Sequence, residues 1–306
     1  MKNKKIAIFY GGKISQHLVM IREAAKKLGA SLELISYNRV GFDTEKGEVF
    51  IRGGVGKWEE RVDVNSFEVI FFRTTGKHWE EVNLVIDGIK NEKIKIVDPL
   101  VKVGKPSMAC KAYQMLELKK AGIDVPKTVY GSLQYLRESG IAQFEFPVIL
   151  KGSGGDRGTR VYKADNQEEL EALTMEMRES EIEEGRRYML QEFIPNDGDY
   201  RVLVLGDRVL GAMKRFSQSK SEFRNNYSAG GGVEISHLPE ELYELAIKAA
   251  KTCGLLVAGV DIAFRDFDKS RPVIWEVNKG PQFSGFMKAT GIDVPAEIVK
   301  FLMEIE

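Results

Sequence analysis

The first hundred residues alternate between strand-like and helix-like stretches, and this alternation constrains the fold more than any other feature. Apolar runs typical of buried strands lie at residues 6–10, 32–37, 69–72 and 95–97. Helical spacing of apolar residues appears between them at residues 15–28 and 82–90. This alternation predicts a parallel sheet covered by helices, with ligands beyond the carboxyl ends of its strands. The residues at those ends are Gly11, Gly12, Arg73 and Asp98.

The rest of the chain predicts two further units, as its 306 residues and 43% hydrophobic content allow. Helices are expected at 107–121, 166–178, 240–253 and 295–305, strands at 148–151 and 160–163, and a hairpin turn at Gly206 and Asp207. We therefore predict an α/β fold of three domains. A parallel α/β domain spans 1–100, a small central α+β domain 101–187, and an antiparallel α+β domain 188–306.

Composition restricts the function. The 45 basic and 45 acidic residues balance, so no overall field attracts nucleic acid or a membrane. Two cysteines, Cys110 and Cys253, make no disulfide framework. No apolar run approaches the ~20 residues of a membrane helix, and the N-terminal apolar stretch is too short for a signal peptide. We expect a cytoplasmic protein without a nucleic-acid or membrane partner.

A hairpin near the C-terminus carries a candidate metal site. A turn centred on Asp268 places Asp261 opposite Glu276, and Glu276 shares a strand face with Asn278 because alternate side chains point the same way. Three hard oxygen ligands on one face suit Mg²⁺ that is held partly by phosphates and water. The other interpretation is the polar outer face of a surface hairpin.

A glycine-rich loop at 152–158 follows the buried strand that ends at Lys151. Its spacing matches neither the phosphate loop nor the dinucleotide fingerprint, and a strand follows it rather than a helix. An ordinary hairpin turn is one interpretation. The other is a flap whose backbone N–H groups cover phosphates. Lys151 favours the flap, since a lysine ending a buried strand is costly unless an anion meets it.

Two further segments keep two interpretations each. The apolar stretch 188–195 either stops as a strand before Pro195 or forms a hinge whose backbone pairs with a purine edge. Arg73 either binds a substrate carboxylate or forms a surface salt bridge. The three histidines lie in no motif, which argues against zinc or histidine-based nucleophilic chemistry.

Seven motifs in order resemble the ATP-grasp superfamily, and within it the RimK-like and LysX-like carboxylate–amine ligases. The resemblance runs from about Asp98 to the C-terminus. The motifs are Lys111, Lys151 with its flap, Gln191 to Ile194, Gly198 to Val202, Phe223 to Asn226 before Gly230 and Gly231, Asp261, and Glu276 to Asn278. One departure is Ala229, where close relatives have arginine, and a second is one extra glycine beside it. Because that loop faces the acceptor in the family, the acceptor substrate stays open.

The resemblance implies a role for each matching residue. ATP would be held at its phosphates, adenine, ribose and nucleotide contacts by Lys111, Lys151, Gly154, Gly155, Gln191, Glu192, Phe193, Ile194, Asp199, Arg224, Asn225 and Asn226. Two Mg²⁺ ions, with Mn²⁺ as an alternative, would bind Asp261, Glu276 and Asn278. Arg201, Arg215 and Lys151 would act on the transferred phosphate. Gly11, Gly12 and Arg73 lie outside the resemblance, and we expect substrate there because they stand at strand ends of the first domain.

This resemblance implies an ADP-forming ligase that joins an amino acid or peptide carboxylate to an amine through an acyl phosphate. The site of lysines, arginines and Mg²⁺ ligands suits that chemistry, because phosphoryl transfer needs positioning and charge neutralisation rather than a covalent nucleophile. The alternatives are an ATP-grasp kinase and a non-catalytic ATP-binding module. Relatives are often homodimers or homotetramers, so we expect one of these states.

Overall fold

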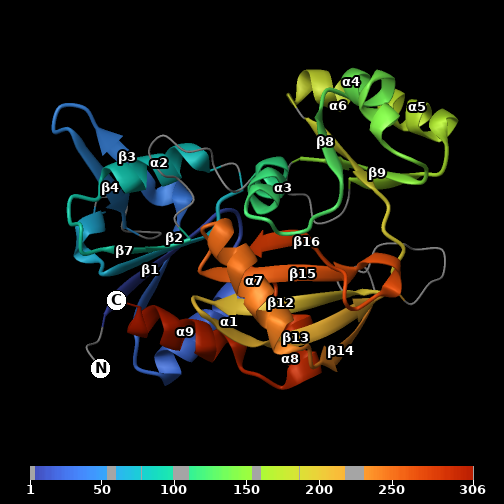
Figure 1. Ribbon diagram of the computed structural model, residues 1–306. Coiled ribbons are helices and arrows are strands. Elements are labelled where there is room, and N and C mark those ends of the chain that lie inside the picture. The colour runs from blue at the N-terminus through green and yellow to red at the C-terminus, as the bar shows by residue number, and fades with distance from the viewer. Residues whose placement is uncertain are drawn as a thin grey trace.

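The structure is a computed structural model that describes residues 4–53, 60–76, 78–98, 110–153, 160–185, 187–217 and 231–305. Figure 1 shows three lobes: the N-terminal lobe, a central lobe that projects from the rest, and a C-terminal lobe that carries the largest sheet. In the part of the chain that is described, no helix has the length and apolar character needed to cross a membrane.

The N-terminal lobe is the parallel α/β unit that the sequence predicts. Its sheet has the order β2 (Ser31–Ser36), β1 (Lys5–Tyr10), β6 (Val69–Thr74), β7 (Lys95–Val97), with every pair parallel. Helices α1 (Gln16–Lys27) and α2 (Trp79–Asp87) connect the strands. The Ser15 side chain caps α1 by accepting from the Leu18 N–H at 3.4 Å, and Gly29 follows its end with a positive φ of 66°.

This lobe also contains a small antiparallel sheet that the sequence analysis missed. Its strands are β3 (Val40–Asp43), β4 (Glu48–Arg52) and β5 (Arg61–Val62). Short 3-10 turns at Tyr37–Arg39 and Val64–Ser66 precede and follow it. Such short strands carry little periodic signal, so the pattern of apolar residues did not predict them.

The central lobe is an antiparallel sheet covered by helices on one face. Its order is β10 (Val161–Ala164), β9 (Val148–Gly152), β11 (Tyr188–Glu192), β8 (Thr128–Gly131). The helices are α4 (Leu133–Glu138), α5 (Gln167–Glu176) and α6 (Arg178–Glu183), with a 3-10 turn at Gly140–Gln143. The helix expected at 166–178 is confirmed as α5, and a second helix that the sequence did not predict, α6, follows it.

The predicted domain boundaries need two corrections. The boundary at 187/188 assigned β11 to the C-terminal domain, but its hydrogen bonds to β8 and β9 place it in the central sheet. The helix expected at 107–121 is described as α3 (Lys111–Lys120), with Cys110 at its N-cap; Ser107 lies outside the described residues. Met115 and Leu118 of α3 pack into the core of the other two lobes, so α3 does not belong with the central sheet.

The C-terminal lobe is built on five antiparallel strands. Their order is β14 (Gly232–Ser236), β13 (Arg208–Phe216), β12 (Asp199–Leu205), β15 (Val257–Phe264), β16 (Pro272–Lys279). Helix α7 (Glu240–Thr252) covers one face, and α8 (Ser284–Thr290) and α9 (Val294–Glu304) cover part of the other. A 3-10 turn at Arg265–Phe267 begins the connection between β15 and β16.

The cores divide the molecule differently from the three lobes. Two apolar clusters each contain residues of both the N-terminal and the C-terminal sheets, such as Phe9 with Val260 in one and Ile8 with Leu203 in the other. Helix α1 lies against α9 (Figure 1). The central lobe has a separate core around Leu136. The outer lobes therefore form one body, to which the central lobe is attached.

Candidate active site

One face of the C-terminal sheet changes from apolar to charged along its length. Near α8 and α9 it presents Leu203, Leu205, Met213 and Val257, all buried in a shared core. Farther along, the alternation of the same strands puts six polar side chains on this face. They are Asp199, Arg201, Arg215, Asp261, Glu276 and Asn278. The sequence analysis predicted all six as site residues, and the sheet brings them together.

A β-bulge sets the orientation of the predicted metal ligands. Asp261 lies opposite Glu276, as the sequence predicts, but Ile262 pairs with Ile274, which leaves Trp275 as the extra residue. Ile274 and Val277 consequently both face the core under α7 despite their odd spacing. Without the bulge, burying Ile274 there would turn Glu276 into the same core. A bulge beside a site commonly re-aims a side chain in this way.

Asp261 is the most densely bonded of these residues. Its carboxylate accepts hydrogen bonds from Arg201 Nε and Nη2, each at 2.7 Å, and from Asn278 Nδ2 at 3.0 Å. Arg215 Nη2 lies 2.9 Å from the same carboxylate. Burial opposes ionisation, but the two guanidinium groups outweigh it and lower the pKa of Asp261. Asp261 therefore carries its negative charge in a site that is only 4% exposed.

The carboxylate of Asp199 is already paired inside the protein. Both of its oxygens accept from Arg215, through Nε at 3.1 Å and through Nη2, and the side chain is buried. A ribose hydroxyl would have to compete with this buried ion pair. The geometry thus favours Asp199 as the group that orients Arg215, and the ribose contact stays a prediction.

Two lysines from different parts of the molecule approach Glu276. Lys111 Nζ, at the start of α3, lies 2.9 Å from Glu276 Oε1. Lys151 comes from β9 of the central lobe, on the face opposite the buried Val148 and Leu150. Burial lowers the pKa of Lys151 to about 8, although the negative charge of Glu276 opposes this. Desolvation also acts on Glu276, but Lys111 and Lys151 outweigh it and lower its pKa.

The predicted metal ligands fit an ion that arrives with phosphates. Asp261, Glu276 and Asn278 offer only hard oxygen donors from neighbouring register positions. Among the described residues, no group of three or more His, Cys, Asp or Glu side chains could hold a metal ion. The described part of the chain alone thus supplies too few carboxylates for a closed cage, whereas Mg²⁺ readily takes its remaining ligands from phosphates and water.

Several polar groups of the predicted hinge already bond to other groups of the protein. The Glu192 N–H donates to the Lys127 carbonyl at 3.1 Å, and the Glu192 carboxylate pairs with Arg265 at 2.8 Å. A hinge contact from Glu192 to adenine would therefore use its carbonyl. Gln191 is buried and donates to Thr128 Oγ1 at 2.7 Å, while Phe193 and Ile194 continue the chain toward the C-terminal lobe. Arg265 also pairs with Asp124 at 2.9 Å. It thus links Glu192 of the hinge to the segment that leads into β8.

The strand ends of the N-terminal lobe meet the same region from another side. Arg73 is 3% exposed and donates to the Pro281 carbonyl at 2.9 Å, so the alternative of a surface salt bridge is wrong. Gly11 donates to the Thr74 carbonyl at 2.9 Å, and a Cβ there would lie 2.5 Å from His78 Cδ2. Gly12 has a φ of 74°. The backbone alone explains both glycines, and their substrate role stays a prediction.

Several predicted residues lie outside the described part of the chain. They are Gly154 and Gly155 of the flap, the nucleotide-contacting Arg224, Asn225 and Asn226, and the departure at Ala229. The sequence motifs gave no role to Lys279, which lies one residue after Asn278 and donates a hydrogen bond to Thr75. The signal available was its position at the end of a strand that already carried two predicted ligands.

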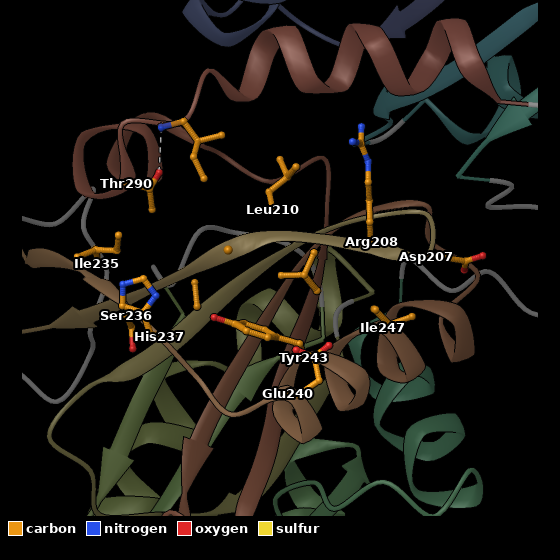
Figure 2. A pocket seen from close by; sticks show the side chains of 14 residues that line it. Asp207, Arg208, Leu210, Ile235, Ser236, His237, Glu240, Tyr243, Ile247 and Thr290 are labelled. Atoms are coloured by element: carbon orange, nitrogen blue, oxygen red, sulfur yellow. Dashed lines mark hydrogen bonds between the residues drawn. The ribbon is translucent and has the colours of Figure 1, made fainter.

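A cavity of about 500 Å³ lies away from these residues. Figure 2 shows its lining, which includes Arg208 and Leu210 of β13, Tyr243 of α7 and Thr290 of α8. This is the end of β13 opposite to Arg215, and none of the six charged-face residues lines the cavity. The convergent charges, rather than this cavity, mark the candidate active site.

Known proteins resemble this chain in sequence. Residues 107–302 match the family model described as a RimK-like ATP-grasp domain. The chain is 34% identical over 212 residues to a probable alpha-L-glutamate ligase of Cellvibrio japonicus, covering 67% of this chain and 65% of that protein. It is 39% identical over 158 residues to a probable alpha-L-glutamate ligase 1 of Shewanella frigidimarina, covering 51% and 50%.

The fold also has close structural counterparts. The ATP-grasp ligase PsnB complexed with minimal precursor superposes with a TM-score of 0.71 at 18% identity, covering 98% of each chain. PsnB has also been solved with a phosphomimetic variant of the minimal precursor, Mg and ADP, with a TM-score of 0.68 at 18% identity and coverage of 98% of each chain.

The three-lobed fold and its charged face thus define an ATP-grasp protein. The chain belongs to the RimK-like ATP-grasp family, because that family's model matches more than half of it. This confirms the predicted family and fold class. The two curated matches span only half to two thirds of those relatives' own length.

Proposed function

We propose that the chain is an ADP-forming, ATP-dependent carboxylate–amine ligase that works through an acyl phosphate. One observation carries the proposal: Asp261, Glu276 and Asn278 lie together on a sheet face that Arg201, Arg215, Lys111 and Lys151 also reach. Such a site can position and neutralise a triphosphate, and it offers no activated protein nucleophile. The ligase names of the relatives support the same chemistry.

The proposed reaction has two steps. A substrate carboxylate oxygen attacks the γ-phosphorus, the bond from that phosphorus to the β,γ-bridging oxygen breaks, and ADP leaves. An amine nitrogen then attacks the acyl carbon, the bond from that carbon to the phosphate oxygen breaks, and inorganic phosphate leaves as the nitrogen loses a proton. Neither step needs a covalent enzyme intermediate, because positioning and charge neutralisation lower the barrier to phosphoryl transfer.

The residues act by binding and orientation. Lys111 and Lys151 would neutralise phosphate oxygens from two sides, and Arg201 and Arg215 would stabilise charge on the transferred group. Asp261, Glu276 and Asn278 would hold two Mg²⁺ ions, or Mn²⁺ with the same oxygen ligands, and these ions would supply charge neutralisation when bound. The hinge residues Gln191 to Ile194 would place the base.

The separate core of the central lobe suits it to open and close over the site. Lys151 lies on this lobe, whereas Glu276 and Asp261 belong to the body formed by the outer lobes. Closure would bring the lysine to the phosphates and exclude water, which would otherwise hydrolyse an acyl phosphate. With β11 assigned to the central lobe and α3 to the body of the outer lobes, the unit that we propose to move is the central sheet with its helices, from β8 to β11.

The substrates we propose are small: an amino acid or a peptide on each side of the new amide bond. The relatives named alpha-L-glutamate ligases make L-glutamate the first compound to test. We propose a cytoplasmic enzyme without a nucleic-acid or membrane partner, assembled as a homodimer or homotetramer.

Product analysis tests the proposal. With ATP, Mg²⁺, N-acetyl-L-glutamate and hydroxylamine, the ligase should release ADP and inorganic phosphate in equal amounts and form a hydroxamate. Omission of either the carboxylate or hydroxylamine should stop phosphate release. A phosphorylated alcohol without phosphate release would instead identify a kinase. ATP binding without turnover across a screen of amino acids and dipeptides would identify a non-catalytic module.

A further inference from the structure

A second cluster of buried charge lies where the strand ends of the N-terminal lobe meet the end of β16. Its members are Arg73 and Thr75 from β6 and the turn after it, Asp98 after β7, and Lys279 at the end of β16. We name it the junction cluster. Among the described residues, none of its three charged groups forms an ion pair, in contrast to the charged face.

Arg73 is the residue that most needs a further partner. Phe9 pairs with Phe72 and Tyr10 with Thr74, so Arg73 is the extra residue of a β-bulge at the end of β6. Its Nη2 donates to the Pro281 carbonyl at 2.9 Å, whereas its buried Nη1 has no hydrogen-bond partner among the described residues. The guanidinium lies 5.5 Å from the centre of the Phe283 ring. A buried cation with an unused donor is costly unless an anion satisfies it.

Lys279 adds a second cation without a carboxylate partner in the described part of the chain. Its Nζ donates to Thr75 Oγ1 and lies 5.4 Å from the centre of the Trp79 ring. Trp79 starts α2, so this lysine crosses from the C-terminal lobe to the N-terminal one. Two cations thus converge on one junction, each bonded to neutral groups only.

Asp98 is the carboxylate of the cluster, and its hydrogen bonds go to backbone N–H groups rather than to the two cations. Its Oδ1 accepts from the N–H groups of Leu256 and Val257 at 2.7 and 3.0 Å, which fixes the start of β15. Its Oδ2 is buried and has no hydrogen-bond partner in the part of the chain that the structure describes. Asp98 adopts a left-handed φ of 56°, a conformation that non-glycine residues adopt at a cost. It therefore offsets part of the positive charge without closing the cluster by an ion pair.

The junction cluster is physically continuous with the charged face. A Cβ at Gly259 would lie 3.0 Å from Pro281 Cβ and 3.5 Å from Arg201 Cδ. Pro281, whose carbonyl holds Arg73, thus packs against the strand that carries Asp261. Gln282 and Ser284, which are chain neighbours of the Arg73 contacts Pro281 and Phe283, are exposed.

We propose that Arg73, assisted by Lys279, binds a carboxylate group of a substrate, beside the face that binds the nucleotide. The proposal rests on the proposed ligase function, which requires an acid next to the phosphates. Two sources share this chemistry: the carboxylate that becomes phosphorylated, and a non-reacting carboxylate of the amine substrate. Both are amino acid or peptide groups.

Binding of two probes, measured by calorimetry without ATP, tests the site independently of catalysis. The probes are N-acetyl-L-glutamate, which offers carboxylates but no free amine, and L-glutamate. Arg73→Gln should weaken the binding of at least one probe by about tenfold or more, as loss of a charge-assisted hydrogen bond predicts. Arg73→Lys should recover part of the loss. Arg61→Gln is the control, because Arg61 pairs with Asp43 at the surface of the same lobe.

Kinetics then separate the two sources. With hydroxylamine as the amine, a raised KM for N-acetyl-L-glutamate assigns Arg73 to the reacting acid. With L-glutamate as the amine, a raised KM for L-glutamate alone assigns it to the second substrate. In both cases the KM for ATP should stay within about twofold of the wild-type value.

The inference is overturned if Arg73→Gln and Lys279→Gln both bind the probes as the wild type does, or if the folded wild type binds neither probe. Failure of the ligase proposal has a different signature: the wild type binds the probes but forms neither ADP nor hydroxamate. A thermal melt of each variant shows whether it is folded, and Arg73→Lys replaces Arg73→Gln if the latter is not.

Discussion

The two charged clusters of the molecule differ in how their charges are paired. On the face of the C-terminal sheet, Asp261 is shared by Arg201 and Arg215, and Glu276 pairs with Lys111. At the junction, Arg73 and Lys279 bond only to neutral groups of the described residues, and buried polar atoms of Arg73 and Asp98 have no hydrogen-bond partner among those residues. The described part of the chain thus neutralises the first cluster but not the second.

The difference teaches what each cluster requires. A self-neutralised cluster keeps its side chains in place, and removing its buried centre, Asp261, damages the fold as well as the site. A cluster with unused donors gains from a ligand, because an unsatisfied buried group costs roughly 1–3 kcal/mol. A variant at Asp261 should therefore affect stability, and variants at the junction should affect substrate binding.

The largest effect is expected for Asp261→Asn, which breaks the paired cluster. Two buried arginines would lose their shared carboxylate, and breaking such a pair costs about 3–5 kcal/mol. The variant should unfold at a lower urea concentration and also need more Mg²⁺ for turnover. Asp266→Asn is the control, because Asp266 pairs with Arg271 at the surface and should change stability by only about 0–1 kcal/mol. Wild-type stability in Asp261→Asn would contradict the pairing.

Glu276→Gln should affect activity far more than stability. Glu276 and Lys111 are partly exposed, so losing their pair should cost at most about 1 kcal/mol of folding free energy. Removal of a group that organises charge in the site should lower ATP turnover about 10²–10³-fold. Glu297→Gln matches it on α9, where Glu297 pairs with Lys300 at similar exposure, and should leave turnover unchanged. Turnover near the wild-type rate in Glu276→Gln would remove Glu276 from the mechanism.

Gly259→Ala tests the contact between the two clusters. The added Cβ would lie 3.0 Å from Pro281 Cβ, so the turn that holds Arg73 must shift. Overpacking of this kind costs about 1–3 kcal/mol, and we expect weaker substrate binding as well. Gly140→Ala in the central lobe, where the nearest atoms lie at 3.4 Å, is the milder comparison. Equal denaturation curves for the two variants would show that the clusters are not in tight contact.

The smallest effect is the pH dependence of ATP affinity. Burial lowers the pKa of Lys151 to about 8, so its charge is largely present at pH 7 and lost above pH 8. ATP affinity should fall up to about tenfold between pH 7 and pH 9 in calorimetry. Between pH 8 and pH 10.5 the folded state binds fewer protons than the unfolded state. The contribution of Lys151 to the free energy of unfolding therefore increases with pH in this range. Unfolding consequently does not explain the loss of ATP affinity. Lys151→Arg should abolish the trend, and a persisting trend would assign it to another group.

Sequence alone identified the charged face because it follows from strand alternation and motif order. Asp261, Glu276 and Asn278 lie on one side as the i, i+2 rule requires, and the parallel N-terminal sheet follows its strand–helix alternation. The same rules could not reveal the bulges at Trp275 and Arg73. A bulge depends on which face of a strand the assembled core buries, and a single segment carries no signal of that.

Tertiary contacts decided the remaining differences. Glu192 and Asp199 match motif positions, yet their groups are bonded to Lys127, Arg265 and Arg215. The assignment of β11 to the central sheet depended on pairing with residues that lie 36 to 63 positions earlier in the chain. Lys279 directly follows Asn278 in the sequence. Its place in the junction cluster depends on contacts with the N-terminal lobe, which the sequence does not reveal.

Calorimetry with a non-hydrolysable ATP analogue tests the central claim that the charged face binds a magnesium nucleotide. The folded wild type should bind the analogue in the presence of Mg²⁺ and lose most of that affinity when EDTA is added, and Glu276→Gln should show little difference between the two conditions. Equal binding with and without Mg²⁺ in the wild type, or no binding at all, would contradict the account.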